Sequence, residues 1–140
     1  MPGKRLVRCL ILALAGLMAA ATTAAAQQAD WRPVGNPEDS FWIDAASIVR
    51  EGNRVRYWHE SRRAEPTQGG PGGPYDRIGG RMEIDCRART IRTLEMYTKL
   101  GDRTNYSSPA SGEGLRPEAI PPGRSAEADL RAVCLNEWRR

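Results

Sequence analysis

The stretch "RIGGRMEIDC", residues 77–86, carries the clearest structural pattern in the chain, because apolar or small residues alternate with charged residues. Successive side chains of a β-strand point to opposite sides of a sheet. A period of two therefore predicts a strand with one buried and one solvated face. The predicted buried side comprises Ile78, Gly80, Met82, Ile84 and Cys86, and the solvated side comprises Arg81, Glu83 and Asp85.

Strand signals continue on both sides of this stretch. Gly52-Asn53 is a turn signal between two apolar segments and predicts a β-hairpin. We expect His59, in the second strand of that hairpin, to be a half-exposed sheet residue. The four tryptophans are expected mostly in the core, because a domain with one Phe needs other bulky side chains. The further strand segments are 30–34, 40–48 and 90–100, and the tryptophans are Trp31, Trp42, Trp58 and Trp138.

Two segments, 64–76 and 101–124, are rich in Gly and Pro and are predicted to be irregular. The first is expected to be a mobile hairpin loop, and the second to hold one short strand around Tyr106. Long irregular loops in compact domains are commonly functional. We therefore interpret loops 64–77 and 101–124 as a contact surface, with Arg62, Arg63, Tyr75 and Tyr106 as candidate binding residues.

The last segment, residues 125–138, has the period of an amphipathic helix. Ser125 follows a Pro-Pro-Gly stop and is expected to be the N-cap. With the strands, this helix predicts an α+β fold in which an antiparallel sheet of about five to six strands packs against one C-terminal helix. The expected apolar stripe of the helix comprises Ala126, Leu130, Val133, Cys134 and Trp138.

The N-terminus, residues 1–26, has the pattern of a secretory signal peptide. A basic start precedes an apolar run and a small-residue site, so cleavage is expected between Ala26 and Gln27. Cys9 precedes the apolar run, which gives no lipoprotein anchor. We expect an exported protein of the periplasm or cell surface, with no membrane span after cleavage.

The part that remains after cleavage, residues 27–140, suits one small domain with a core at about 30–138. Cleavage removes three of the 21 basic residues and no acidic residue, so the net charge falls from +4 to +1. A near-neutral domain has little electrostatic attraction to nucleic acid. We therefore expect no nucleic-acid partner, and the oligomeric state stays open.

The two remaining cysteines, Cys86 and Cys134, lie on the apolar faces of a predicted strand and the predicted helix. In an oxidising compartment we predict that they form a disulfide. Such a bond is worth about 4 kcal/mol of stability in the chain-entropy model. Two alternatives stay open. One cysteine could be a nucleophile with His59 as its base. The two cysteines could also be metal ligands, although a structural zinc site needs four ligands.

The order of these motifs resembles the surface-adhesin protein E family of envelope proteins, over about residues 30–135. The resemblance implies an antiparallel sheet against a C-terminal helix, bridged cysteines, and an extracytoplasmic protein that binds host extracellular-matrix or serum proteins. The motifs that carry it are Trp31 and Val34, Trp42-Ile43-Asp44, Ser47-Ile48, Gly52-Asn53, Val55-Arg56-Tyr57-Trp58, Asp85-Cys86, Pro122-Gly123 and Val133-Cys134.

These observations favour a non-catalytic, adhesin E-like binding protein with an unidentified protein partner. The alternative is a small soluble periplasmic protein that assists or inhibits an enzyme of the cell envelope. The sequence nominates no set of nucleophile, base and orienting group, so we expect no enzymatic activity and no cofactor.

Overall fold

The computed structural model describes residues 27–139, so the predicted signal peptide, including Cys9 and Ala26, lies outside the described residues. Within them the chain forms one antiparallel sheet of seven strands and a C-terminal α-helix, as predicted. The strands follow each other in space as β1-β2-β3-β4-β5-β6, and β7 pairs with β5. The elements are β1 (Trp31–Val34), β2 (Phe41–Glu51), β3 (Arg54–Thr67), β4 (Tyr75–Asp85), β5 (Thr90–Leu100), β6 (Arg103–Pro109), η1 (Gly112–Leu115), β7 (Glu118–Ala119) and α1 (Ser125–Leu135).

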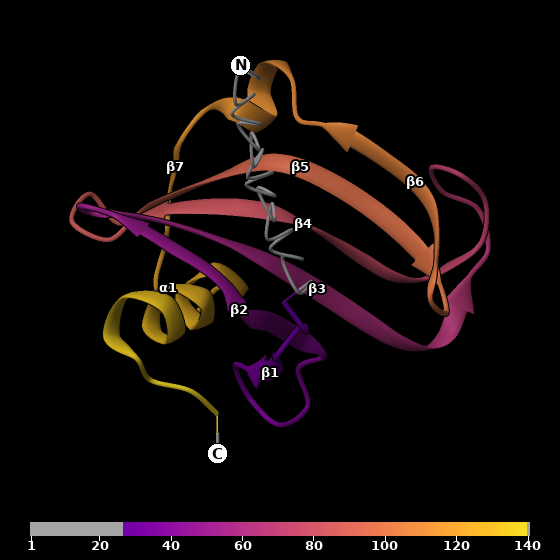
Figure 1. Cartoon of the computed structure of the whole chain (residues 1–140), viewed down its shortest axis with the longest axis horizontal. Helices are drawn as coiled ribbons and strands as arrows, with labels where there is room; N and C mark the ends of the chain where they lie inside the picture. Colours follow the sequence, from indigo (N-terminus) through magenta and orange to yellow (C-terminus); the bar gives the residue numbers. More distant parts are fainter. Residues whose placement is uncertain (1–26, 140) are drawn as a thin grey trace, which may run out of the picture.

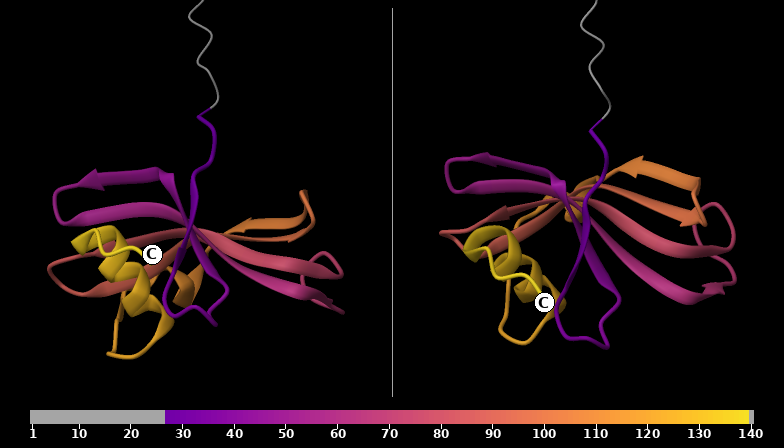
Figure 2. Two further views of the ribbon diagram at one scale, coloured as in Figure 1. Left: turned by 90° about the horizontal axis from the view of Figure 1, so that it is seen from below. Right: turned by 60° about the horizontal axis from the view of Figure 1, so that its bottom comes forward.

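The sheet is strongly twisted, and α1 lies against one end of one face (Figure 1 and Figure 2). We call this the inner face and the opposite one the outer face. The near end of the sheet carries α1 with the β2–β3 and β4–β5 turns. The far end carries the β3–β4 and β5–β6 turns, on the right of Figure 1. The two ends therefore present different surfaces.

The core fills the space between α1 and the near end of the inner face. The alternation in residues 77–86 is confirmed, since Ile84 is fully buried and pairs with Val55 of β3. The predicted hairpin at Gly52-Asn53 joins β2 and β3. The buried core residues are Val34, Ile43, Val55, Tyr57, Ile84, Ile120, Leu130, Ala132 and Val133.

A β-bulge interrupts the alternation in β5. Met82 pairs with Thr93 while Arg81 pairs with Glu95, which leaves Leu94 as the extra residue. A bulge shifts the faces of the strand by one residue and increases the local twist. Residues 90–100 therefore form a strand although their sequence does not alternate cleanly.

The two Gly/Pro segments are more ordered than predicted. β3 continues to Thr67, which pairs with Tyr75, so only residues 68–74 form the turn. The second segment contains β6, η1 and β7 rather than one short strand. Backbone pairing within an exposed hairpin does not require an apolar face, so these strands lack a period-two apolar pattern. The Gly and Pro content therefore predicted irregular structure instead.

Helix α1 begins differently from the prediction. The N-cap is Arg124 rather than Ser125, and its side chain makes no capping hydrogen bond. Instead, the Glu127 carboxylate accepts a hydrogen bond of 2.6 Å from the backbone N–H of Gly123. An acidic side chain in the first turn also favours the positive end of the helix dipole. Asn136 ends the helix in the left-handed conformation, with φ of 58°.

The tryptophan prediction was wrong, because all four side chains are half-buried. Trp42 and Trp31 pack against the guanidinium of Arg62, and Trp138 packs against that of Arg32. Tyr57, from the apolar face of β3, supplies the largest fully buried side chain of the core. Trp138 also packs against the edge of the core, and Trp58 packs against Tyr97. The indoles of Trp31, Trp42 and Trp138 combine apolar packing with cation–π contacts.

The predicted disulfide between Cys86 and Cys134 is present, with the two Cα atoms 5.8 Å apart. Cys86 directly follows β4, so the bond ties the near end of the sheet to α1. The guanidinium of Arg50 adds a hydrogen bond to the carbonyl oxygen of Val133 in the same helix. Both contacts hold the C-terminal half of α1 on the inner face.

Removing this disulfide should destabilise the domain by about 4 kcal/mol, because the bond closes a loop with a sequence separation of 48 residues. We expect the C86A/C134A variant to show this loss in urea unfolding measured by tryptophan fluorescence. Added reductant should lower the stability of the parent protein but not of the variant. Equal stability of parent and variant would contradict the assignment.

Candidate binding sites

The outer face contains a fully buried carboxylate, Glu60, at the centre of a polar and aromatic cluster. Its Oε1 accepts a hydrogen bond of 2.6 Å from Nε of Arg62, and its Oε2 accepts one of 2.8 Å from the Tyr97 hydroxyl. Tyr97 lies over Gly79, where an added Cβ would come within 2.7 Å of the ring. Burial and then the hydrogen bond to Glu60 raise the pKa of Tyr97, so it stays a donor. We call these residues the Glu60 cluster.

Arg62, a predicted binding residue, is therefore a structural residue. Its guanidinium pairs with Glu60 and lies 4.4 Å from the ring centroid of Trp42 and 5.3 Å from that of Trp31. These contacts leave little of its charge for a partner. The sequence analysis did not identify this pairing, because it depends on burial of Glu60 by Tyr97 of β5, 37 positions away along the chain.

The other three predicted binding residues meet at the far end, around the turn 68–74. Arg63 is exposed and lies 5.7 Å from the ring centroid of Tyr75. Gly72, at φ of +80°, packs so tightly on β6 that an added Cβ would lie 3.0 Å from Cβ of Tyr106. Both tyrosines are half-buried. The structure thus brings Arg63, Tyr75 and Tyr106 together, and we call this the far-end surface.

Hydrogen bonds fasten the turn to its neighbours. The Thr98 hydroxyl donates to the carbonyl oxygen of Pro71 at 2.8 Å, and the Asn105 side-chain amide donates to that of Pro74 at 2.7 Å. Backbone groups in a Gly- and Pro-rich turn have few other partners within the ladder. These bonds give the far-end surface a defined shape.

A second site lies under α1, where Asp129 is buried against the sheet. Its Oδ2 accepts a hydrogen bond of 2.8 Å from the Tyr57 hydroxyl and lies 2.9 Å from Nδ1 of His59. The ring of His59 is not aligned for a hydrogen bond, so this contact is an ion pair. Asp129 was not predicted. Asp129 lies three residues after Ala126 and four before Val133, which places it on the apolar stripe of the helix. This position could have indicated that its carboxylate is buried.

The Asp129 carboxylate controls the ionisation of both β3 side chains. Burial lowers the pKa of His59, but Asp129, with a smaller contribution from Glu60, raises it, and the net result lies above the ordinary 6.5. Burial, followed by the charge of Asp129, raises the pKa of Tyr57 well above 10.0. The raised pKa means that the folded protein holds the proton of His59 more tightly than the unfolded chain does, while Tyr57 remains a neutral donor.

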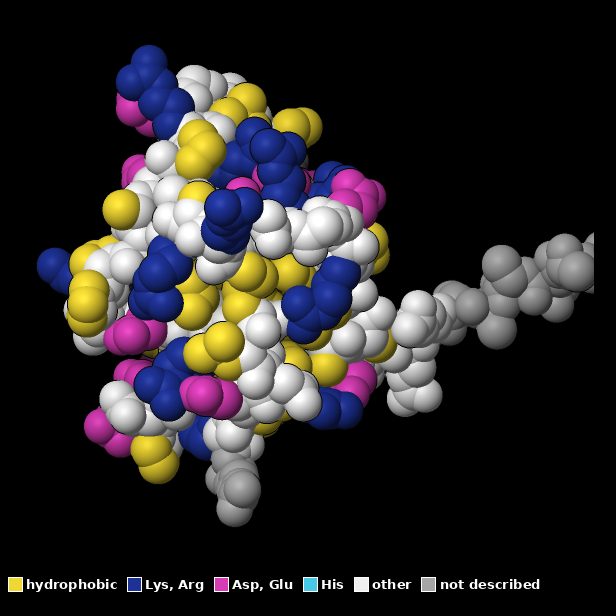
Figure 3. Space-filling model, turned by 90° about the vertical axis from the view of Figure 1, so that its left-hand side faces the viewer, with side chains coloured by type: hydrophobic (Ala, Val, Ile, Leu, Met, Phe, Trp, Pro, Cys, Tyr) yellow, Lys and Arg dark blue, Asp and Glu magenta, His cyan; other side chains and the backbone are white. Residues whose placement is uncertain are grey.

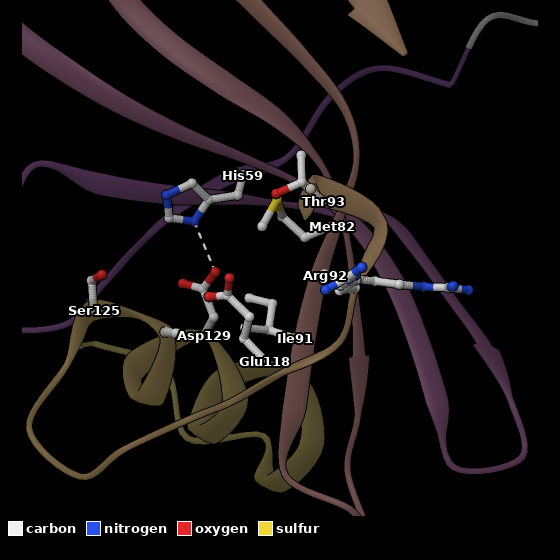
Figure 4. Close-up of a pocket in the computed structure, with 11 residues that line it drawn as sticks. His59, Met82, Ile91, Arg92, Thr93, Glu118, Ser125 and Asp129 are labelled. Carbon is white, nitrogen blue, oxygen red and sulfur yellow. Dashed lines mark ion pairs between the residues drawn. The ribbon is translucent and has the colours of Figure 1, made fainter. Parts of the chain in front are cut away.

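A pocket of about 240 Å³ opens beside this ion pair, between the inner face, α1 and the segment from η1 to β7. Figure 4 shows His59 and Asp129 pointing toward each other, with Met82 and Thr93 across the pocket. Ser125 also lines the pocket, but its hydroxyl makes no hydrogen bond to His59. The pocket thus places a buried carboxylate, an imidazole and a hydroxyl-bearing side chain around one cavity.

The near end presents a different surface (Figure 3). Hydrophobic side chains gather in its centre and Lys and Arg side chains surround them. Val49 of β2 and Leu135 of α1 are among the exposed hydrophobic residues, at 51% and 57% exposure. The sequence pattern did not predict this surface.

The described residues contain no group of three or more His, Cys, Asp or Glu side chains placed to hold a metal ion. Both described cysteines are oxidised, so neither is a free thiol in this structure. Within residues 27–139, no helix has the length and apolar character that a membrane crossing requires.

Replacement of Arg62 by Met should destabilise the domain by about 3–5 kcal/mol, because it leaves the Glu60 carboxylate buried without its cation. The neighbouring Arg63→Met variant is the matched control. Arg63 is exposed, so that change should cost within about 0.5 kcal/mol. Urea unfolding of the two variants measures the difference, and equal effects would contradict the structural role of Arg62.

The raised pKa of His59 predicts pH-dependent stability. The stabilising contribution of the imidazolium is fully present below the unfolded-state pKa of about 6.5 and is lost as pH rises through the higher folded-state value. The free energy of unfolding should therefore fall as pH rises above about 6.5, and His59→Gln should flatten this slope. His59 is the only histidine in the chain, so NMR titration reads its pKa directly. A value at or below 6.5 would contradict the ion pair.

Comparison with known proteins agrees with this architecture. Residues 31–135 match the family model described as Surface-adhesin protein E. No curated protein sequence matches the chain.

Solved structures of Haemophilus influenzae protein E are similar in fold. One crystal form has 12% sequence identity and a TM-score of 0.56, and covers 80% of this chain and 95% of that chain. A second structure has 12% identity and a TM-score of 0.55, with 80% and 92% covered. Protein E from a non-typeable strain has 10% identity and a TM-score of 0.56, with 80% and 82% covered. At these identities the likeness concerns the fold. The family match spans most of the chain, including Cys86 and Cys134, and the chain therefore belongs to the surface-adhesin protein E family.

Proposed function

We propose that this chain is an exported, non-catalytic binding protein that holds a protein partner outside the cytoplasm. Membership of the surface-adhesin protein E family supports this function. As the class of partner we propose a host extracellular-matrix or serum protein, which is what the resemblance to this family implies. Proposed export rests on the pattern of residues 1–26, with cleavage between Ala26 and Gln27.

The far-end surface is the proposed contact region, and its fixed shape is the observation that carries the proposal. The bonds from Thr98 and Asn105 hold turn 68–74 in place before any partner binds. A preorganised surface pays less entropy on binding. Tyr and Arg side chains dominate the binding energy of many protein interfaces, and Arg63, Tyr75 and Tyr106 supply both types here.

A non-catalytic role fits the inner-face pocket as well. Nucleophilic catalysis needs a base within hydrogen-bond reach of the nucleophile. Ser125, His59 and Asp129 share the pocket, yet the contact that the structure forms is the His59–Asp129 ion pair. The Tyr57 hydroxyl is fully buried and donates to Asp129.

Removing the aromatic side chains of the far-end surface should abolish partner binding. We expect the Y75A/Y106A variant to lose capture of proteins from serum and from a solubilised extracellular-matrix preparation, compared with the parent protein immobilised at equal density. Val49→Ser, at the near end, is the control and should bind like the parent, because Val49 lies at the opposite end of the sheet.

Equal capture by the double variant would contradict the far-end surface, and no capture by the parent would contradict the binding function. Protease treatment of intact cells that express the full chain tests its location. We expect external protease to digest the protein on intact cells. In untreated cells, we expect the mass of the mature protein to correspond to a chain that begins at Gln27. A mature mass protected from protease would instead favour the periplasmic accessory or inhibitor role.

A further inference from the structure

The inner-face pocket contains a buried acceptor that no described residue satisfies. Oδ1 of Asp129 makes no hydrogen bond, although the side chain is only 3% exposed and lines the pocket. The other oxygen of the same carboxylate already contacts Tyr57 and His59. A buried carboxylate oxygen without a donor is costly, so this atom favours a ligand that brings an N–H or O–H group.

A second carboxylate gives the pocket its charge preference. Glu118 of β7 lines the same pocket as Asp129, and both side chains are drawn in Figure 4. Glu118 forms no ion pair with any described residue. The two arginines that line the pocket form ion pairs with other carboxylates. Arg92 contacts Glu83 at 2.7 Å, and Arg116 contacts Glu113 at 3.1 Å. An uncommitted carboxylate in the same pocket as a buried one favours a cation.

Part of the remaining lining is apolar, alongside the hydroxyl groups of Thr93 and Ser125, and the pocket limits the size of the ligand. Met82 and Ile91 from the sheet and Ala126 from α1 surround the carboxylates. A volume of about 240 Å³ accommodates a small molecule or one long side chain, but not a folded segment. Apolar walls with a few directed polar groups are typical of small-ligand sites.

We propose that this pocket binds a primary alkylammonium group, with its N–H donors on Asp129 Oδ1 and its alkyl chain against Met82, Ile91 and Ala126. The group can belong to a free amine or to a lysine side chain, since the recognising chemistry is the same. The pocket lies under α1 and not at the far-end surface. Its occupancy therefore neither requires nor tests the partner contact proposed above.

Binding of such a cation is coupled to the protonation of His59. Two positive groups then share one carboxylate, so the ligand lowers the pKa of the imidazole, and by linkage binding strengthens as pH rises. Tyr57 and His59 from β3 contact Asp129 directly. The other charged residues that line the pocket are Arg92 from β5 and Arg116 and Glu118 from the segment before α1.

Titration of the intact mature protein with n-butylamine, followed by NMR, tests the proposal. We expect shifts of the His59 ring signals, a lower His59 pKa in the bound form, and no shifts with n-butanol. The second probe is lysine with both its amino and carboxyl termini capped. If both butylamine and the capped lysine bind, the natural ligand is assigned as a lysine side chain. If only butylamine binds, the natural ligand is assigned as a free amine. Absence of His59 shifts, or equal shifts with butanol, would overturn the proposal.

Two variants connect the signal to the pocket. Asp129→Asn should weaken butylamine binding by about ten-fold or more, as expected for loss of a charge-assisted hydrogen bond. Because this change can also unfold the domain, Glu118→Gln provides a second test on an exposed side chain and should weaken binding by a few fold. Glu65→Gln makes the same charge change on an exposed residue of β3 and should have no effect. Equal binding by E118Q and E65Q would place the amine elsewhere and overturn the assignment.

Discussion

The docking of α1 on the inner face is the constraint on which the rest of the near end depends. A helix of 11 residues is marginal in water without tertiary contacts. The Cys86–Cys134 bond fixes one part of α1 to the sheet, and the Tyr57–Asp129 hydrogen bond fixes the preceding turn. With the helix held there, Leu130 and Val133 close the core, and the side chains of Ala126 and Asp129 form one wall of the pocket. The pocket and the raised pKa of His59 therefore both result from helix placement.

The far end is stabilised by different means, because α1 does not reach it (Figure 2). On the outer face, the Glu60 cluster joins β3 to β5 through a buried carboxylate. On the other side, turn 68–74 packs on β6 and bonds to Thr98. Buried polar contacts specify geometry when every partner is satisfied. The shape of the far-end surface depends on these local contacts rather than on a hydrophobic core, so its side chains can be changed with little effect on the near end.

The sequence predicted elements wherever burial produces a simple period. The alternation around Ile84, the hairpin at Gly52-Asn53 and the stripe of α1 required no knowledge of long-range contacts, and the shared apolar position of the two cysteines predicted their bond. Sites formed by residues far apart were not predictable in this way. Glu60 and Asp129 are charged residues buried by tyrosine partners 37 and 72 positions away. The apolar stripe of α1 indicates that Asp129 is buried, but no local pattern identifies these distant partners. Of the candidate binding residues, Arg63, Tyr75 and Tyr106 do lie together, while neighbouring Arg62 faces the Glu60 cluster, because successive side chains of a strand point to opposite faces.

Hydrogen exchange with mass spectrometry, on oxidised and reduced protein, tests the dependence on helix docking most directly. If the disulfide holds α1 on the sheet, reduction should increase exchange in residues 125–135 and in the adjoining segment 110–124. Strands β3, β4 and β5 should keep their protection, because their ladders and the Glu60 cluster do not involve the bond. Unchanged protection of α1 after reduction, or a uniform loss of protection across the sheet, would contradict this account.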